Sequence, residues 1–255
     1  MKQKKTLIVG GTKGSGYALV KFLEDKKHLL SIMGRKKPPN SFNHNKTTTF
    51  WEVDITDELC LFDVCESIIN RNGYINNLIF FQRFRGKKND WEGEIEASLT
   101  ATKNTIEYFT DPLKKLTANI NAIVVISSNA SYLIADEQPL SYHVAKAGLK
   151  QLVRYYAVSL GSKNIRVNAV SPGTVLKDES KEFYLNNQHI VNLYKNITPI
   201  GRMGTPQDIA NVVDFLCSSK AAFITGQDIV VDGGLSLQWQ ESLSRRVAEG
   251  NKDDK

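Results

Sequence analysis

Val9-Gly10-Gly11-Thr12-Lys13-Gly14-Ser15-Gly16 is the stretch that decides the fold of this chain. It follows a short β-rich run at residues 6–9 and leads into an amphipathic stretch at residues 15–26. Glycines at such a turn allow positive φ angles and a close approach of the backbone to a ligand. The helix that follows begins with unpaired N–H groups and the positive end of its dipole, which together favour an anion. The sequence therefore predicts a site for the pyrophosphate of a dinucleotide between the first strand and the first helix.

Short apolar runs alternate with longer amphipathic stretches along the rest of the chain. The runs lack polar alternation, as expected for strands that are buried on both faces. This alternation predicts right-handed βαβ crossovers and a parallel sheet between two layers of helices. No linker, repeat or composition shift separates a second domain, so we expect one doubly wound α/β domain over residues 1–234. The seven predicted strands are residues 6–9, 29–33, 50–53, 78–81, 123–126, 165–170 and 229–231, and the predicted helices are residues 15–26, 58–72, 91–109, 141–161 and 207–216.

Basic residues follow the second predicted strand, in Gly34-Arg35-Lys36-Lys37. In dinucleotide-binding folds an acidic residue near this point bonds the ribose 2′-hydroxyl of NAD. Arg35 can instead hold a 2′-phosphate through its planar fork of donors, and Lys13 can reinforce it. This favours NADP(H) over NAD(H), with a merely solvated basic loop as the alternative. Asp54, at the end of the third strand, is placed to accept from the adenine amino group.

Ser141-Tyr142-His143-Val144-Ala145-Lys146 contains a second pattern with chemical meaning. In a helix, Tyr142 and Lys146 lie one turn apart on the same face. An ammonium group close to a phenol favours the phenolate form, which makes the tyrosine a usable acid and base near neutral pH. Ser128, just after an apolar run, is placed to hydrogen-bond a substrate carbonyl. Tyr-x-x-x-Lys occurs by chance in many helices, so the pair gains meaning only from its context.

Composition and charge exclude several classes of protein. The 255 residues are 41% hydrophobic and 24% charged, which is ordinary for a soluble globular protein. No apolar run approaches the roughly 18 residues that span a bilayer, so we expect neither a membrane protein nor a secretory signal. The net charge of +6 suits anionic ligands but does not by itself predict nucleic-acid binding. The three cysteines lack metal-like spacing, so we expect reduced thiols, no metal site and a cytoplasmic protein.

These patterns together resemble the compact branch of the short-chain dehydrogenase/reductase family, from residue 6 to about residue 234. The glycine spacing differs from that of the longer sugar-nucleotide epimerase branch. The overall pattern is most similar to that of 3-oxoacyl-[acyl carrier protein] reductases. The motifs that carry the resemblance are Gly10-x-x-x-Gly14-x-Gly16, Asp54, Ser128, Tyr142-x-x-x-Lys146, Asn168-Ala169-Val170-Ser171-Pro172-Gly173, Pro199-Ile200-Gly201-Arg202 and Val231-Asp232-Gly233-Gly234.

The resemblance implies a role for each matching residue. Tyr142 is expected to be the general acid or base, Lys146 to bond the nicotinamide ribose, and Ser128 to orient the carbonyl, with Ser127 as a neighbour to test. Residues 175–200 are expected to form a mobile flap over the substrate. Many relatives are tetramers, so we expect a homotetramer or homodimer. The expected cofactor-binding residues are Gly10, Thr12, Lys13, Gly14, Ser15, Gly16, Arg35, Asp54, Ile55, Gln82, Tyr142, Lys146, Pro172, Gly173, Thr174 and Val175.

Several positions depart from the family pattern. Phe80-Phe81-Gln82-Arg83 replaces the usual Asn-Asn-Ala-Gly after the fourth strand, which changes the cofactor wall or the pocket behind it. Ser98 stands where an asparagine usually serves the proton relay, and Val9 and Lys177 each replace a threonine. Arg83 and Arg85 are candidates to bind a carboxylate or phosphate of the substrate, or the cofactor. A solvated loop explains these two arginines equally well.

We therefore expect an NADPH-dependent oxidoreductase that interconverts a ketone and a secondary alcohol. The substrate is expected to be a small-molecule or carrier-bound carbonyl compound, either a 3-oxoacyl thioester or a small anionic or sugar-derived ketone. The alternative is an NADP(H)-binding regulatory or scaffold protein without catalysis, which the joint retention of Ser128, Tyr142 and Lys146 opposes. Residues 235–255 extend beyond the family pattern. Trp239 and Leu243 are placed to pin a short helix to a neighbouring subunit, and the last residues are expected to be disordered.

Overall fold

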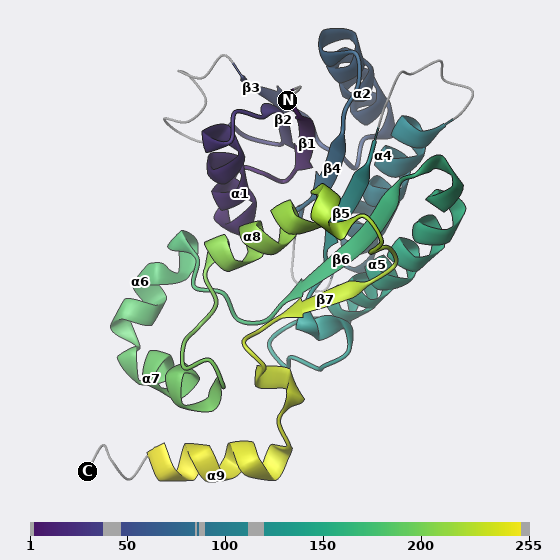
Figure 1. The fold of residues 1–255 in the computed structure, drawn as a ribbon. Helices are drawn as coiled ribbons and strands as arrows, with labels where there is room; N and C mark the ends of the chain where they lie inside the picture. Colours follow the sequence, from purple (N-terminus) through teal and green to yellow (C-terminus); the bar gives the residue numbers. More distant parts are fainter. Residues whose placement is uncertain (1–2, 38–46, 85, 87–89, 112–119, 251–255) are drawn as a thin grey trace.

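Seven parallel strands form one sheet in the order β3-β2-β1-β4-β5-β6-β7. The computed structural model, shown in Figure 1, describes residues 3–37, 47–84, 86, 90–111 and 120–250. The seven predicted strands are confirmed, and each boundary lies within two residues of the predicted one. The doubly wound α/β class is confirmed as well. The strands are β1 (Lys5–Val9), β2 (Leu29–Gly34), β3 (Thr48–Glu52), β4 (Asn77–Phe80), β5 (Ala122–Ile126), β6 (Arg166–Pro172) and β7 (Asp228–Val231).

Helices cover both faces of the sheet (Figure 1). α1 (Gly14–Asp25) and α8 (Pro206–Leu216) pack on one face, while α2 (Glu58–Asn72), α4 (Ala101–Thr110) and α5 (Leu140–Ser159) pack on the other. Successive strand residues point to opposite faces, so Leu7 and Val9 join one hydrophobic core and Ile8 joins the other. This double burial is why the strand sequences lack polar alternation.

The predicted helix at residues 91–109 is helical throughout, but it changes geometry in its middle. α3 (Trp91–Ile95) passes into a π-helical turn, η1 (Glu96–Thr100), before α4 begins. π-turns inside α-helices are rare and are frequent at functional sites. The turn contains Ser98, one of the predicted site residues.

Two helices occupy the predicted flap, and a third follows the last strand. α6 (Asp178–Asn186) and α7 (Gln188–Ile197) lie between β6 and α8, and α9 (Gln240–Gly250) packs against α7 at one end of the molecule (Figure 1). Gln238 Nε2 donates to the Ile197 carbonyl at 2.7 Å, which ties the extension to α7. The predicted disorder of the last residues concerns residues 251–255, which lie outside the described part of the chain. Short 3-10 turns complete the structure at η2 (Asn129–Ser131), η3 (Gly161–Lys163), η4 (Ser219–Ala221) and η5 (Leu235–Leu237).

None of the helices in the described ranges is both long enough and apolar enough to cross a membrane.

Candidate active site

The strand order reverses direction at β1 and β4, which lie side by side although α1, β2, β3 and α2 separate them in the chain. In open parallel sheets, ligands bind outside the carboxyl ends of the strands at such a switch point. A cleft of about 900 Å³ opens at this place. Predicted cofactor-binding residues line it, namely Gly10, Thr12, Lys13, Arg35, Asp54, Ile55 and Gln82.

The glycine turn is packed too closely for larger residues. Gly10 has a φ of +84°, and a Cβ atom there would lie 2.5 Å from the backbone nitrogen of Gln82. A Cβ atom on Gly16 would lie 2.6 Å from the Gly10 carbonyl oxygen. The turn therefore rests directly on the end of β4 and on its own first residue. The side chain of Lys13, the residue before α1, makes no capping hydrogen bond. The first turn of α1 contains no acidic residue. This leaves its N–H groups and dipole available to an anion.

Basic and acidic residues both line the cleft. Lys13, Arg35 and Lys36 line it, and Gly34, which precedes Arg35, lies against Thr12; we call Thr12, Lys13, Arg35 and Lys36 the basic corner. Asp54 Oδ1 accepts from the backbone N–H of Thr56 at 3.1 Å and from its hydroxyl at 2.8 Å. These bonds fix the carboxylate on the cleft wall. The corner has the charge that a phosphate group requires.

Gln82, on the cleft wall, has a buried side-chain oxygen without a hydrogen-bond partner among the described residues. Its Nε2 donates to Thr102 Oγ1 at 2.6 Å, and Thr102 Oγ1 donates to the Ser98 carbonyl at 2.6 Å. Because the threonine hydrogen is already used, Gln82 must present its NH₂ group to Thr102. Its Oε1 is then a buried acceptor, and it has no partner among the described residues. An orphaned buried acceptor in a cleft indicates a ligand that carries a donor.

The aromatic pair before Gln82 is divided between the two sides of the sheet. Phe80 is fully buried in the core under α2, α4 and α5, whereas Phe81 packs toward α1 and also lines the cleft. The replacement of the usual Asn-Asn pair thus adds apolar packing at Phe80 and an apolar cleft wall at Phe81.

Tyr142 and Lys146 lie on one face of α5, as predicted. Lys146 Nζ is 5.6 Å from the centroid of the Tyr142 ring, and the Arg83 guanidinium carbon is 5.2 Å from the same centroid. Lys146 is buried and donates to the Ile126 carbonyl at the end of β5, at 3.1 Å. Burial lowers the pKa of Lys146 to about 8; the charge of Glu94 raises it, and the charges of Arg83 and Lys177 lower it further.

The two serines after β5 have different tasks. Ser127 is buried, and its hydroxyl donates to the Lys146 carbonyl at 2.9 Å, so it joins the strand to α5. Ser128 Oγ accepts from the Ala130 N–H at 3.2 Å and begins η2. Its own hydrogen has no acceptor among the described residues, so it is free for a substrate. Sequence reasoning placed both serines near the site but could not separate these tasks.

The segment that carries Ser128 is held against α5 and β7. His143 Nε2 accepts from the Ala135 N–H at 2.9 Å, and its Nδ1 lies 3.0 Å from the Pro139 carbonyl. These contacts assign the ring hydrogen to Nδ1. Asn129 donates to Asp232 at 3.1 Å, across 103 residues of chain. Burial acts to raise the pKa of Asp232, but hydrogen bonds from Ser236, Gly234 and Asn129 lower it overall.

The turn after β6 brings the flap over the glycine turn. Gly173 approaches β7 so closely that a Cβ atom would lie 2.6 Å from Asp232 Cβ. Thr174 Oγ1 donates to the Tyr194 hydroxyl of α7 at 3.1 Å. A Cβ atom on Gly14 would lie 3.3 Å from Lys177 Cδ and 3.5 Å from a carboxylate oxygen of Glu179. Lys177 and Glu179, on either side of the start of α6, therefore lie near Gly14, the first residue of α1.

Glu94 is the residue of this region that sequence reasoning missed. It is 4% exposed, and its Oε1 accepts from the Ser98 hydroxyl at 2.6 Å. Ser98 is 1% exposed, so the predicted relay residue is engaged with a buried carboxylate. Arg83 lines the cleft and donates to Gln138 Oε1 at 3.0 Å, and its contact to substrate or cofactor stays a prediction. Arg85 lies outside the described residues.

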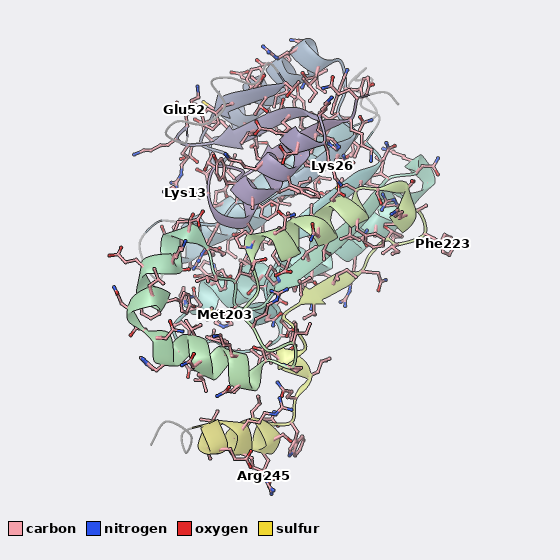
Figure 2. All side chains as sticks on the ribbon, turned by 60° about the vertical axis from the view of Figure 1, so that its left-hand side comes forward. Lys13, Lys26, Glu52, Met203, Phe223 and Arg245 are labelled. Carbon is pink, nitrogen blue, oxygen red and sulfur yellow. The ribbon has the colours of Figure 1, made fainter. Side chains whose placement is uncertain are left out.

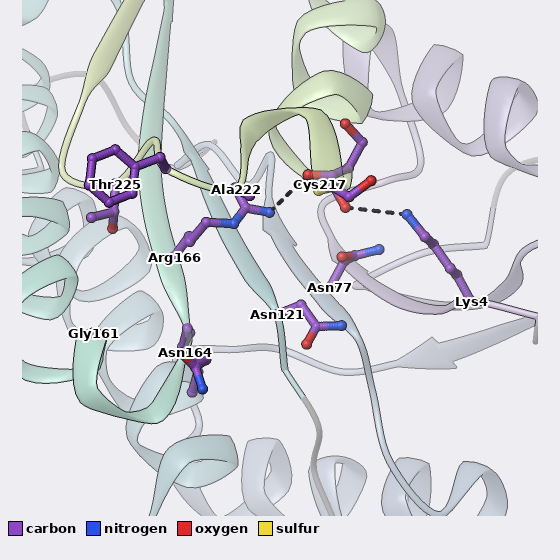
Figure 3. A pocket seen from close by; sticks show the side chains of 13 residues that line it. Lys4, Asn77, Asn121, Gly161, Asn164, Arg166, Cys217, Ala222 and Thr225 are labelled. Atoms are coloured by element: carbon purple, nitrogen blue, oxygen red, sulfur yellow. Dashed lines mark hydrogen bonds between the residues drawn. The ribbon is translucent and has the colours of Figure 1, made fainter.

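A second cavity, of about 760 Å³, lies at the amino ends of β1, β4, β5 and β6, and Figure 3 shows the side chains that line it. Arg166 donates to the carbonyls of Leu216 and Ser218, and Lys4 donates to that of Cys217. These cations thus satisfy the carbonyl groups at the C-terminus of α8, which is a structural role. Figure 2 shows Phe223, on the rim of this cavity, far from Lys13 of the glycine turn. Groups of three or more His, Cys, Asp or Glu side chains that could hold a metal do not occur in the described ranges.

Known proteins share both the sequence pattern and the fold. A family model described as Enoyl-(Acyl carrier protein) reductase matches residues 36–236. The chain is 31% identical over 256 residues to the 3-oxoacyl-[acyl-carrier-protein] reductase FabG of Aquifex aeolicus, which covers 92% of this chain and 98% of the relative.

Solved structures superpose over nearly the whole chain. A short-chain dehydrogenase from Leptospira borgpetersenii with bound NAD⁺ is 26% identical, has a TM-score of 0.77, and covers 92% of this chain and 94% of its own. ElxO with NADP bound is 24% identical, has a TM-score of 0.80, and covers 92% of this chain and 100% of its own. On the family match, the identity to FabG and the doubly wound architecture, this chain is an oxidoreductase that belongs to the short-chain dehydrogenase/reductase family.

Proposed function

We propose that the chain catalyses the NADP(H)-dependent interconversion of a ketone and a secondary alcohol. The observation that carries this proposal is the pair on α5, where the Lys146 ammonium nitrogen lies 5.6 Å from the Tyr142 ring centroid beside the dinucleotide cleft. A phenol next to a buried cation is suited to exchange a proton with a reacting oxygen. Without the lysine, a tyrosine would be a poor acid–base catalyst near neutral pH.

The residues of the cleft fit a dinucleotide. The glycine turn and the uncapped start of α1 suit the pyrophosphate, and the free Oε1 of Gln82 suits a ribose hydroxyl. The corner of Thr12, Lys13, Arg35 and Lys36 suits a 2′-phosphate, and it supports NADP(H) over NAD(H). The nicotinamide of the bound cofactor would supply or accept the hydride.

The protein residues move the proton and hold the oxygen. In the reductive direction, the Tyr142 hydroxyl donates its proton to the developing alkoxide, and the Ser128 hydroxyl donates a hydrogen bond to the same oxygen. The Lys146 ammonium stabilises the phenolate that remains on Tyr142. In the oxidative direction, the phenolate accepts the alcohol proton.

Arg83 supports an anionic substrate. Its guanidinium lies over the Tyr142 ring and is steadied by Gln138, at the end of β4 where the reacting group would sit. A carboxylate or phosphate on the substrate could bind this fork in a bidentate manner. This favours a carrier-bound 3-oxoacyl thioester, whose phosphopantetheine carries a phosphate, or a small anionic ketone over a neutral ketone.

The test uses NADPH oxidation with a panel of neutral and anionic ketones, together with cofactor binding followed by fluorescence. Tyr142→Phe is expected to lose at least about a hundredfold in kcat while it retains cofactor affinity, because only the proton donor is removed. Arg83→Gln is expected to raise KM for anionic ketones more than for neutral ones. Cofactor binding without turnover of any ketone by the wild-type protein would instead favour the regulatory or scaffold function. Undiminished turnover in Tyr142→Phe would refute the mechanism.

A further inference from the structure

His143 is a buried histidine next to the proposed proton donor, and both nitrogen atoms of its ring form hydrogen bonds. It is 9% exposed and directly follows Tyr142 on α5. Its Nε2 accepts from the Ala135 N–H at 2.9 Å, and its Nδ1 donates to the Pro139 carbonyl at 3.0 Å. A neutral ring with its hydrogen on Nδ1 satisfies both partners. The imidazole therefore bridges the chain from residue 135 to residue 139.

The bridged segment is a turn that leads into α5. The Gln138 N–H donates to the Ala135 carbonyl at 2.9 Å, which closes the turn from within. Asp136 and Glu137 at the tip of the turn are exposed, and Pro139 gives α5 no side-chain cap. A backbone hydrogen bond alone orders an exposed turn only weakly, because fixing each residue costs conformational entropy. The ring of His143 adds a hydrogen bond at each end of this turn.

Gln138 connects the turn to Arg83. Its Oε1 accepts from Arg83 Nη2 at 3.0 Å, and the guanidinium carbon of Arg83 lies 5.2 Å from the centroid of the Tyr142 ring. Arg83 itself is exposed, and a long exposed side chain loses much rotamer freedom when it is held in one place. The Gln138 acceptor can hold the guanidinium only while the turn that carries Gln138 stays in position.

We propose that His143 is a positioning residue for Arg83, because it fixes the turn at residues 135–139 from which Gln138 holds the guanidinium over Tyr142. The inference rests on the proposed function, in which Arg83 binds the anionic group of the substrate, and it gives His143 a part in substrate selection. An arginine that moves freely in solvent attracts anions from every direction. A guanidinium fixed above the ring instead offers its planar fork of donors beside the reacting carbonyl.

The test compares two substitutions of His143 with a matched control. His143→Phe keeps a ring but removes both hydrogen bonds, whereas His143→Gln keeps an acceptor that can reach the Ala135 N–H. The control is His28→Phe, since His28 is also buried, at 8% exposed, and its Nδ1 lies 3.2 Å from Thr6 Oγ1. His28 directly precedes β2, so it lies at the amino ends of the strands and not at the carboxyl ends where the site lies.

The kinetic readout is the reduction of an anionic ketone and of a neutral ketone of similar size. In His143→Phe we expect KM for the anionic ketone to rise about three- to fivefold, as for the loss of an exposed charge contact, with KM for the neutral ketone and both kcat values nearly unchanged. His143→Gln is expected to show a smaller rise. His28→Phe is expected to lower the melting temperature without changing KM for either ketone.

A double substitution tests whether Arg83 transmits the effect. In the Arg83→Gln background, His143→Phe is expected to add nothing to KM for the anionic ketone, since the guanidinium that it positions is gone. Additive effects would overturn the inference. Equal losses of kcat for both ketones in His143→Phe would also overturn it, because they would indicate a direct effect on Tyr142, whose ring centroid lies 6.2 Å from that of His143.

NMR of labelled arginine in the full-length, cofactor-free protein provides a readout that needs no substrate. The Arg83 signal is assigned from Arg83→Gln, and the rotation of its guanidinium about the Cζ–Nε bond is measured. We expect faster rotation in His143→Phe and in Gln138→Ala, and the wild-type rate in His28→Phe. Unchanged rotation in His143→Phe overturns the inference, and His143→Gln and Gln138→Ala allow the same comparison if His143→Phe does not fold. A wild-type protein that reduces neither ketone would refute the proposed function alone.

Discussion

Lys146 illustrates, at the scale of a single residue, the free-energy cost of burying a cation. The side chain is 4% exposed, and burial lowers its pKa from 10.5 to about 8. The unfolded chain therefore binds more protons than the folded chain between about pH 8 and pH 10.5, so this group makes stability rise with pH in that window. Below pH 8 the folded protein carries the full penalty, on the order of 3 kcal/mol.

Lys146→Met is accordingly expected to be more stable than the wild-type protein at pH 7. The net gain in the free energy of unfolding is roughly 2 kcal/mol, because the lost hydrogen bond to Ile126 offsets part of the relieved penalty. The difference should shrink as the pH rises from 8 toward 10. Urea denaturation at several pH values measures it, with the exposed Lys220→Met as the matched control. Equal stability of Lys146→Met and the wild-type protein at pH 7 would contradict the burial argument.

Residue chemistry alone singled out Tyr142, Lys146 and Ser128, because their side chains suit the proposed reaction. It could not predict Glu94. Three glutamates, at positions 92, 94 and 96, stand at alternate positions of one segment, and nothing in their order indicates which is buried. Only the packing of α3 and η1 against α5 turns Glu94 inward, while Glu92 and Glu96 line the cleft.

At the scale of elements, the buried strands and the helices that cover them were predicted from their apolar patterns. The flap helices α6 and α7 were not predicted as helices, although α7 is strongly amphipathic, and neither of them contains a fully buried residue. The π-helical turn was not predicted either. A π-helical turn holds one more residue than an α-helical turn, and no particular residue type marks it in the sequence. Tertiary contacts accompany it here, such as the hydrogen bonds from Gln82 to Thr102 and from Thr102 to Ser98.

The β1–α1 turn is packed so closely at Gly16 that an added side chain is expected to destabilise it. Gly16→Ala places a Cβ atom 2.6 Å from the Gly10 carbonyl oxygen and 3.1 Å from Phe81 Cβ. Backbone atoms cannot give way cheaply, so the turn must open, at a cost of about 1–3 kcal/mol in stability. We expect weaker cofactor binding as well, since the same turn is the proposed site of the pyrophosphate.

Gly161→Ala is the matched control for this substitution. An added Cβ there meets nothing within 4 Å, so stability and cofactor binding are expected to be close to those of the wild-type protein. Thermal unfolding and fluorescence titration of both variants decide the matter. A Gly16→Ala protein that binds cofactor as the wild type does would refute the close-packing argument.

At the scale of the whole molecule, the site depends on contacts between distant segments. The Asn129–Asp232 bond joins the end of β7 to the turn after β5, across 103 residues of chain. This pairing follows from the order of the strands in the sheet and not from any local pattern. The homo-oligomer stays a prediction, and the exposed Tyr155 and Val158 on α5 are consistent with a surface that a second copy would cover.

The cofactor gives the prediction that involves the whole chain, because a ligand that binds only the folded protein stabilises all of it. NADPH at about 100 times its Kd should add about 2.7 kcal/mol, or roughly 5–10 °C in melting temperature for a chain of this size. NADH at the same concentration should give a smaller shift, since it lacks the 2′-phosphate that the basic corner favours. Arg35→Ala is expected to reduce the NADPH shift and leave the NADH shift unchanged, whereas Arg245→Ala, on α9, should alter neither. Equal shifts for the two cofactors in the wild-type protein would show that the basic corner of the cleft does not select NADP(H).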